Sequence, residues 1–131
     1  MRKLLLVLVL TLAGCATQPV SPDGGEWAQQ VILVSLPEPL RRDFIADTMK
    51  LGTIPGVEEI HIGRPVRFQD PTLDWWIDDY DIAIFIRFKS EAVTDAYGAH
   101  ALHEAWNEKW SGKFTSFRAM RATSGEAVEY E

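Results

Sequence analysis

The chain is poor in the residue types that define several protein classes. It has one cysteine, Cys15, and three histidines among 131 residues. A single cysteine cannot form a disulfide within the chain, so the fold cannot depend on one even in an oxidising compartment. Basic residues are also few, 13 against 19 acidic ones, which gives a formal net charge of −6. That balance argues against nucleic acid as a partner, because nucleic-acid-binding proteins present a basic face.

Long hydrophobic runs are lacking as well, apart from a short one near the N-terminus. Residues 4–10 are all Leu or Val, and Arg2 and Lys3 precede them. The run is much shorter than the roughly 20 apolar residues that a membrane-spanning helix needs. A basic start, a short apolar core and small residues before a cleavage point are typical of a secretory signal peptide.

The end of this segment, Leu12-Ala13-Gly14-Cys15, resembles the lipobox of bacterial lipoprotein signals. The resemblance implies cleavage after Gly14 and acylation of Cys15, which then becomes the N-terminus. Two or more acyl chains hold a protein stably on a membrane. Ala16 after the cysteine favours the outer membrane, since Asp there retains Gram-negative lipoproteins at the inner membrane. The expected location is therefore the bacterial cell envelope, lipid-anchored on the periplasmic side of the outer membrane. An uncleaved anchor, or a plain thiol at Cys15, is the alternative.

The remaining chain divides into three parts. Removal of residues 1–14 takes two basic residues away and leaves 11 basic against 19 acidic ones, a formal charge of −8. Residues 15–28 are predicted to be the lipidated cysteine and a flexible tether, because residues 16–26 are rich in Pro, Gly, Ser and Thr. Residues 29–123 suffice for one domain. Residues 124–131 are predicted to be an acidic tail.

Hydrophobic spacing predicts four strands and two helical regions in this domain. Residues 31–36 form a continuous apolar run, as in a strand covered on both faces. The other predicted strands are residues 57–64, 81–88 and 114–121. Helical spacing links Leu40, Phe44, Ile45, Thr48 and Leu51, and then, after Ser90 as N-cap and a break at Gly98, Leu102, Trp106 and Trp110. The order β-α-β-β-α-β predicts an α+β, ferredoxin-like fold with helices on one face of a four-stranded antiparallel sheet.

The third predicted strand is apolar on both faces. Ile82, Ile84, Ile86 and Phe88 alternate with Ala83 and Phe85. Helices cover only one face of such a sheet, and soluble domains rarely leave a large apolar face exposed. We therefore expect a second copy of the chain to cover the face with Ala83 and Phe85, giving a homodimer.

Three segments resemble the stress-responsive dimeric α/β-barrel domain (Dabb) family. They are Ile54-Pro55-Gly56-Val57, Tyr80-Asp81 and the more specific Tyr-x-x-His-x-x-His stretch that contains Tyr97, His100 and His103. The resemblance covers residues 29 to about 123 and implies a dimer whose two sheets close into one barrel. The family includes plant stress proteins and the polyketide cyclase that makes olivetolic acid.

In that cyclase the tyrosine and the second histidine of the motif carry an aldol-type ring closure. The resemblance therefore makes Tyr97 and His103 candidate catalytic residues and His100 a candidate ligand contact. Histidine can take a proton near neutral pH, and a phenol can hydrogen-bond a developing oxyanion. The chain departs from the family at Gln30, where a histidine is frequent, and at Ala101, where a proline is frequent. A purely structural, hydrogen-bonded cluster is the alternative interpretation.

The connection 65–80 is long for a compact domain and carries Trp75 and Trp76. We predict that these tryptophans cover a ligand pocket beside Tyr97 or contact another envelope component; packing against the barrel or a partner chain is the alternative. The acidic residues around them, Asp70, Asp74, Asp78, Asp79 and Asp81, lack the spacing of a calcium loop. His61, between Ile60 and Ile62, should point to the opposite face of its strand from these two isoleucines. We predict no metal site and no cofactor, since His100 and His103 have no third ligand nearby in the sequence.

Three functions remain open at this point. The first is an envelope protein that binds a small apolar or aromatic molecule, or another envelope protein. The second is an isomerase- or cyclase-like enzyme with His103 as the base and Tyr97 as the oxyanion donor. The third is a structural or stress module without a ligand. An apolar pocket beside Tyr97 favours the first two, and a filled interior favours the third.

Overall fold

The computed structural model describes residues 27–67, 69 and 75–123. The predicted signal peptide, most of the tether and the acidic tail lie outside the described residues. The strands are β1 (Ala28–Ser35), β2 (Val57–Gly63), β3 (Ile82–Phe88) and β4 (Ser116–Thr123). The helices are α1 (Glu38–Lys50), α2 (Val93–Gly98) and α3 (Ala101–Trp110), with short 3₁₀ turns η1 (Leu51–Thr53) and η3 (Ser111–Lys113).

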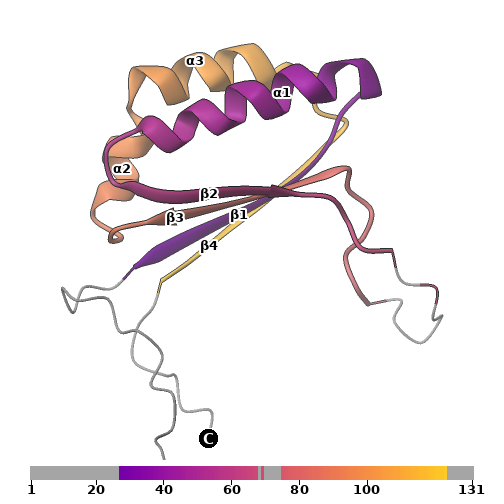
Figure 1. Ribbon diagram of the computed structural model, residues 1–131, viewed down its shortest axis with the longest axis horizontal. Helices are drawn as coiled ribbons and strands as arrows, with labels where there is room; N and C mark the ends of the chain where they lie inside the picture. Colours follow the sequence, from indigo (N-terminus) through magenta and orange to yellow (C-terminus); the bar gives the residue numbers. More distant parts are fainter. Residues whose placement is uncertain (1–26, 68, 70–74, 124–131) are drawn as a thin grey trace, which may run out of the picture.

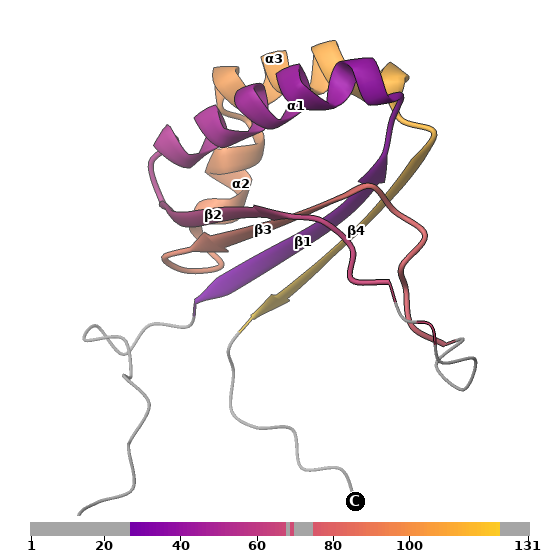
Figure 2. The same ribbon diagram turned by 45° about the vertical axis from the view of Figure 1, so that its right-hand side comes forward.

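The four strands form one antiparallel sheet in the order β2-β3-β1-β4. Helices α1 and α3 lie on one face of it, and α2 lies at one end (Figures 1 and 2). The predicted α+β, ferredoxin-like fold is therefore confirmed. No helix in the described part of the chain is long and apolar enough to cross a bilayer.

A proline marks the start of α1, and a glycine allows the turn between α1 and β2. Pro39 lies in the first turn, where its missing N–H is not needed. After η1, Gly56 adopts a φ of +93°, which side chains other than glycine's rarely allow. A Cβ at Gly56 would lie 2.8 Å from the Cβ of Val93. This close approach brings the start of β2 against α2.

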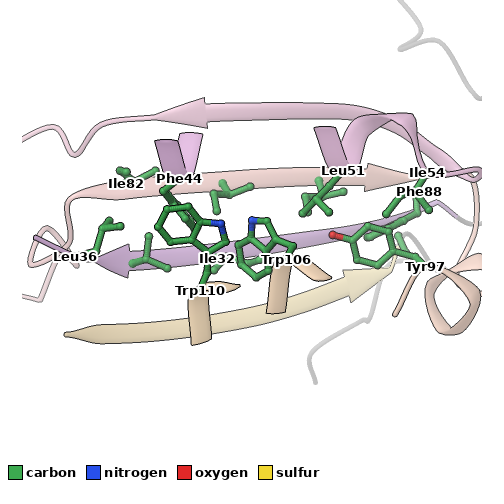
Figure 3. Close-up of a cluster of buried hydrophobic side chains, with 14 residues drawn as sticks. Ile32, Leu36, Phe44, Leu51, Ile54, Ile82, Phe88, Tyr97, Trp106 and Trp110 are labelled. Atoms are coloured by element: carbon green, nitrogen blue, oxygen red, sulfur yellow. The ribbon is translucent and has the colours of Figure 1, made fainter. Parts of the chain in front are cut away.

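The core between helices and sheet is largely aromatic (Figure 3). The Phe44 ring contacts Trp106 and Trp110 at centroid distances of 5.7 and 5.2 Å. Thr48 links the two helices, because its hydroxyl donates to the Phe44 carbonyl and accepts from Trp106 Nε1 at 2.9 Å. These contacts hold α3, and thus the histidine motif, at a fixed place over the sheet.

Two local predictions are wrong. The N-cap of α2 is Ala92 rather than Ser90, and the Thr94 hydroxyl instead donates to the Glu91 carbonyl within the first turn. Ala83 is only 2% exposed, so it needs no partner chain to cover it. Arg118 on β4, which bonds Asp79 in the connection between β2 and β3, lies across Leu33 from Ala83 in the sheet register. The predicted break at Gly98 is confirmed, since α2 ends there.

Candidate functional site

Tyr97 lies on α2 with its side chain almost fully buried, at 1% exposure. Its ring meets Phe88 edge-on at 4.9 Å and His103 at 4.6 Å between centroids. Burial raises the pKa of the Tyr97 phenol well above its usual value, and the positive charge of Arg121 opposes this shift only in part. Tyr97 therefore stays a neutral hydrogen-bond donor at any physiological pH.

No described residue hydrogen-bonds to the Tyr97 hydroxyl, and the hydroxyl oxygen is not fully buried; within the described residues, the fully buried side-chain atom without a partner is Arg118 Nε. Figure 3 shows the oxygen pointing into the space beside Trp106. The oxygen therefore keeps some contact with solvent, although Tyr97 as a whole is only 1% exposed. The structure thus brings together the predicted tyrosine and histidine, but it does not show the closed hydrogen-bond network of a structural cluster.

His103 lies on α3 with its ring between those of Tyr97 and Trp106. Its Nδ1 is 3.0 Å from the Gly98 carbonyl oxygen and 3.3 Å from the side-chain nitrogen of Asn107. The shorter contact suits an N–H donor at Nδ1, whereas the longer one would need Nδ1 to accept. In the tautomer with the proton on Nδ1, Nε2 carries the lone pair and has no partner among the described residues. The break at Gly98 thus exposes a carbonyl that orients the second histidine of the motif.

His100 plays a different part. It is the N-cap of α3, and its Nδ1 accepts a hydrogen bond from the Leu102 backbone N–H at 3.2 Å. This bond satisfies one of the free N–H groups at the start of the helix. The structure gives His100 a capping role, and contact with a ligand through its other nitrogen stays a prediction.

Strand β4 adds residues that the sequence interpretation did not select. The pairing register places Phe117 opposite Val34, Ala119 opposite Ile32 and Arg121 opposite Gln30, on the helix side of the sheet. All three β4 residues are exposed, and β4 is an edge strand of the sheet. We call Phe117, Ala119 and Arg121 the β4 strip. Arg121 donates to the Gln30 side-chain oxygen at 2.7 Å.

Trp75 and Trp76 do not share this site within one chain. Their connection joins β2 to β3 at the Gly63–Ala83 end of the sheet, whereas Tyr97 packs on Phe88 at the other end. The seven residues of β3 separate the two ends by about 20 Å. The expectation that this loop covers a pocket beside Tyr97 is therefore wrong for a single chain (Figure 1). The two rings stack on each other at 4.9 Å, and Trp75 is 68% exposed.

The remaining polar candidates fall outside the site. His61 lies on the sheet face away from the helices, opposite Phe85, as its alternation predicted. Asp79 pairs with Arg118, which lowers the pKa of its carboxyl, and Asp81 pairs with Arg41. Within the described ranges, no three His, Cys, Asp or Glu side chains gather as metal ligands would.

Comparison with known proteins assigns the domain to a family. The model of the stress-responsive A/B barrel domain (Dabb) family matches residues 33–120. No curated protein matches the sequence significantly.

Among solved structures, a Dabb protein of Mesorhizobium loti with a ferredoxin-like fold aligns with a TM-score of 0.62 and 18% identity, covering 74% of this chain and 95% of that one. A dimeric ferredoxin-like protein of unknown function from Thermobifida fusca aligns with a TM-score of 0.60 and 18% identity, over 76% and 92% of the two chains. The hydroxynitrile lyase of Passiflora edulis aligns with a TM-score of 0.64 and 14% identity, over 79% and 97%. Such low identities show a shared fold alone. The family model matches well over half of the sequence, and the chain belongs to the stress-responsive α/β-barrel (Dabb) family.

Proposed function

We propose that this chain binds a small apolar or aromatic molecule at Tyr97 and His103. The observation that carries the proposal is Tyr97: the residue is 1% exposed, and its hydroxyl, which keeps some contact with solvent, has no hydrogen-bond partner among the described residues. A ligand oxygen that accepts from this hydroxyl would remove the cost of leaving it unpaired. The neighbouring rings of Phe88, His103 and Trp106 favour an apolar or aromatic ligand body.

The exposed β4 strip is the side from which a ligand would approach Tyr97. The pocket seen among the described residues lies elsewhere, beside Arg41, Ile62 and Asp81, so the binding proposal rests on Tyr97 and the strip and not on a preformed cavity. A module without a ligand would be expected to close this edge or to satisfy the hydroxyl internally, as buried polar groups usually are.

The protein is further proposed to act as a homodimer that pairs the sheet faces turned away from the helices. The register places His61, Phe85, Val31 and Met120 in one row across all four strands of that face. Phe85 is 37% and Met120 60% exposed, so a second sheet would bury apolar surface there. Solved structures with this fold from Thermobifida fusca and a Jannaschia species are described as dimeric, which supports a dimer here.

The proposed place of action is the bacterial envelope, with the protein anchored through acyl chains on Cys15. Its support is the lipobox-like sequence that ends at Cys15, followed by Ala16. Cys15→Ser should abolish acylation and cleavage after Gly14, because the thiol is the lipid acceptor. Mass spectrometry of the N-terminal peptide checks this, and a normal lipidated N-terminus in the variant would refute the anchor. Fractionation of the unaltered protein with the inner membrane would refute the argument from Ala16.

The exposed Trp75 favours an alternative to small-molecule binding, namely that the chain binds another envelope protein. Aromatic side chains are enriched at protein interfaces. Crosslinking from position 75 in intact cells would then capture a defined protein, whereas small-molecule binding at Tyr97 predicts no such product.

A second candidate, an isomerase- or cyclase-like enzyme, is favoured by the hydrogen bond between His103 and the Gly98 carbonyl. This bond leaves Nε2 as a general base, while the neutral Tyr97 phenol can stabilise a developing oxyanion. The Passiflora edulis protein with the same fold is a hydroxynitrile lyase, so the fold accommodates an enzyme. In the enzyme case His103→Ala should abolish turnover of the bound molecule and leave its binding largely intact.

Native mass spectrometry of the full chain extracted from its own membrane tests the main proposal. We expect a co-purified small molecule on the unaltered protein and a smaller fraction of it on Tyr97→Phe. Tyr80→Phe is the matched control, since Tyr80 lies just before β3, at the other end of the sheet. A ligand-free spectrum together with a large loss of stability in Tyr97→Phe would contradict the proposal and favour a structural module.

A further inference from the structure

Arg121 is a charged residue beside the proposed site, on the helix side of the sheet. Its Nη2 donates to the Gln30 side-chain oxygen, and its guanidinium lies 5.9 Å from the centroid of the Phe88 ring. Phe88 in turn packs edge-on against Tyr97. The guanidinium, the Phe88 ring and the Tyr97 ring therefore form one continuous set of contacts.

The partner of Arg121 distinguishes it from the other arginines on the strands. Arg87 pairs with Glu58 and Glu59, and Arg118 pairs with Asp79. Arg121 bonds only a neutral amide, and within the described ranges no carboxylate forms an ion pair with it. Its charge is consequently not neutralised by these residues, although the side chain is held in a defined position.

The geometry of the guanidinium leaves room for a ligand. Arginine carries five N–H donors, and Gln30 accepts from one nitrogen. The exposed position on the β4 strip keeps the remaining donors open to solvent. A pair of parallel N–H groups matches the two oxygens of a carboxylate, which is the strongest hydrogen-bonding arrangement that arginine offers.

We infer that the molecule bound at Tyr97 and His103 carries a carboxylate and that Arg121 binds it. This inference rests on the proposed binding function. The anionic group lies on the β4 strip against Arg121, and the apolar or aromatic body extends over Phe88 toward Tyr97. A carboxylate is favoured over a phosphate ester because the site offers one guanidinium, which balances a single negative charge.

Matched pairs of probes that differ only in charge test the inference. We would use 2-naphthoate with 2-naphthamide, phenylacetate with phenylacetamide, and octanoate with octanamide, by equilibrium dialysis against the full chain in detergent. Detergent without protein serves as the blank. At least one acid should bind about fivefold more tightly than its amide, as expected for a partly exposed, charge-assisted pair. The preference should shrink in 0.5 M NaCl, since salt screens exposed charges.

Substitutions then assign the preference to Arg121. Arg121→Gln should bind acid and amide equally, and Arg121→Lys should keep a reduced preference because it retains the charge without the fork. Arg42→Gln is the matched control: it removes the same charge from an exposed position on α1 and should keep the preference.

The outcomes separate the two proposals. Equal binding of acid and amide, or an unchanged preference in Arg121→Gln, overturns the carboxylate inference. The binding function stands in that case if Tyr97→Phe weakens both members of a pair. Two results together overturn the binding function and the inference with it. They are the failure of all six probes to bind and the absence of any effect of Tyr97→Phe on the amount of co-purified molecule.

Discussion

Replacing Tyr97 by phenylalanine distinguishes a structural hydroxyl from one kept for a ligand. A buried hydroxyl that holds the fold through a hydrogen bond costs about 1–3 kcal/mol when the bond is removed. The Tyr97 hydroxyl makes no such bond within the described residues, so its removal loses none. The variant also relieves part of the desolvation penalty of this hydroxyl, at most about 1 kcal/mol because the oxygen keeps some contact with solvent. We therefore expect Tyr97→Phe to be as stable as the unaltered protein or up to about 1 kcal/mol more stable.

The assay is chemical denaturation and calorimetry of the ligand-free full chain at one fixed protein concentration. Fixed concentration matters because dimerisation alters apparent stability. For a domain of this size, a gain of about 1 kcal/mol corresponds to a rise in Tm of roughly 4–8 °C. Added ligand should raise the Tm of the unaltered protein more than that of Tyr97→Phe, since the variant lacks the donor.

Thr48→Val is the control that shows the assay can detect a structural hydroxyl. It keeps the side-chain shape, but it removes the donor to the Phe44 carbonyl and leaves the buried Trp106 N–H without an acceptor. This variant should lose about 2–3 kcal/mol. A comparable loss in Tyr97→Phe would refute the reasoning, because it would mean that the hydroxyl has a structural partner.

Three further outcomes follow from other contacts. His100→Ala should lose about 1 kcal/mol with the α3 cap, and His100→Ser should recover most of it in the same melts. Phe85→Glu should leave the chain monomeric or insoluble in analytical ultracentrifugation, because pairing would bury an unpaired carboxylate; an unaltered protein that stays monomeric at micromolar concentration would contradict the paired-sheet arrangement. Hydrogen bonds from Lys109 and Lys50 lower the pKa of Asp47 to about 2 from 3.8, so Asp47 stabilises the fold above pH 4 and loses this effect as pH falls toward 2. Asp47→Asn should lack that part of the acid dependence in denaturation curves at pH 7, 4 and 2.5.

The parts of the fold that depend on local sequence could be predicted. The spacing of Phe44, Thr48 and Leu51 marks α1, and Gly98 marks the end of α2, because both signals act within a few residues. The N-cap of α2 was missed, because the helix begins at Val93 after a turn at Glu91 whose carbonyl accepts from the Thr94 backbone N–H, and no side chain caps it. Strand β1 starts earlier than its apolar run predicts, because pairing of Ala28 with Phe88 and Thr123 holds the polar residues after it in the sheet.

The candidate site could be predicted only in part, because some of its contacts join residues that are far apart in the sequence. The motif supplied Tyr97 and His103, which lie six residues apart. Arg121 meets Gln30 across 91 residues, so only the strand register reveals that pair. The location of Trp75 and Trp76 could have been deduced from the predicted strand order. The loop that enters β3 and the helix that follows β3 must lie at opposite ends of that strand, so the loop cannot reach Tyr97 in the same chain. The unpaired state of the Tyr97 hydroxyl has no sequence signal at all.

The strand period of two assigns neighbouring residues to two different surfaces. On β1, Gln30 faces the candidate site and Val31 faces the proposed partner chain; on β4, Arg121 and Met120 divide in the same way. A slip of one residue in the β1–β4 register would exchange these surfaces and place a guanidinium in the dimer interface. The β1–β4 register must therefore suit both the candidate site on one face and the proposed dimer interface on the other. Because the faces are separated by the sheet itself, substitution at Met120 should weaken dimerisation without altering binding at Arg121, and the reverse should hold for Arg121.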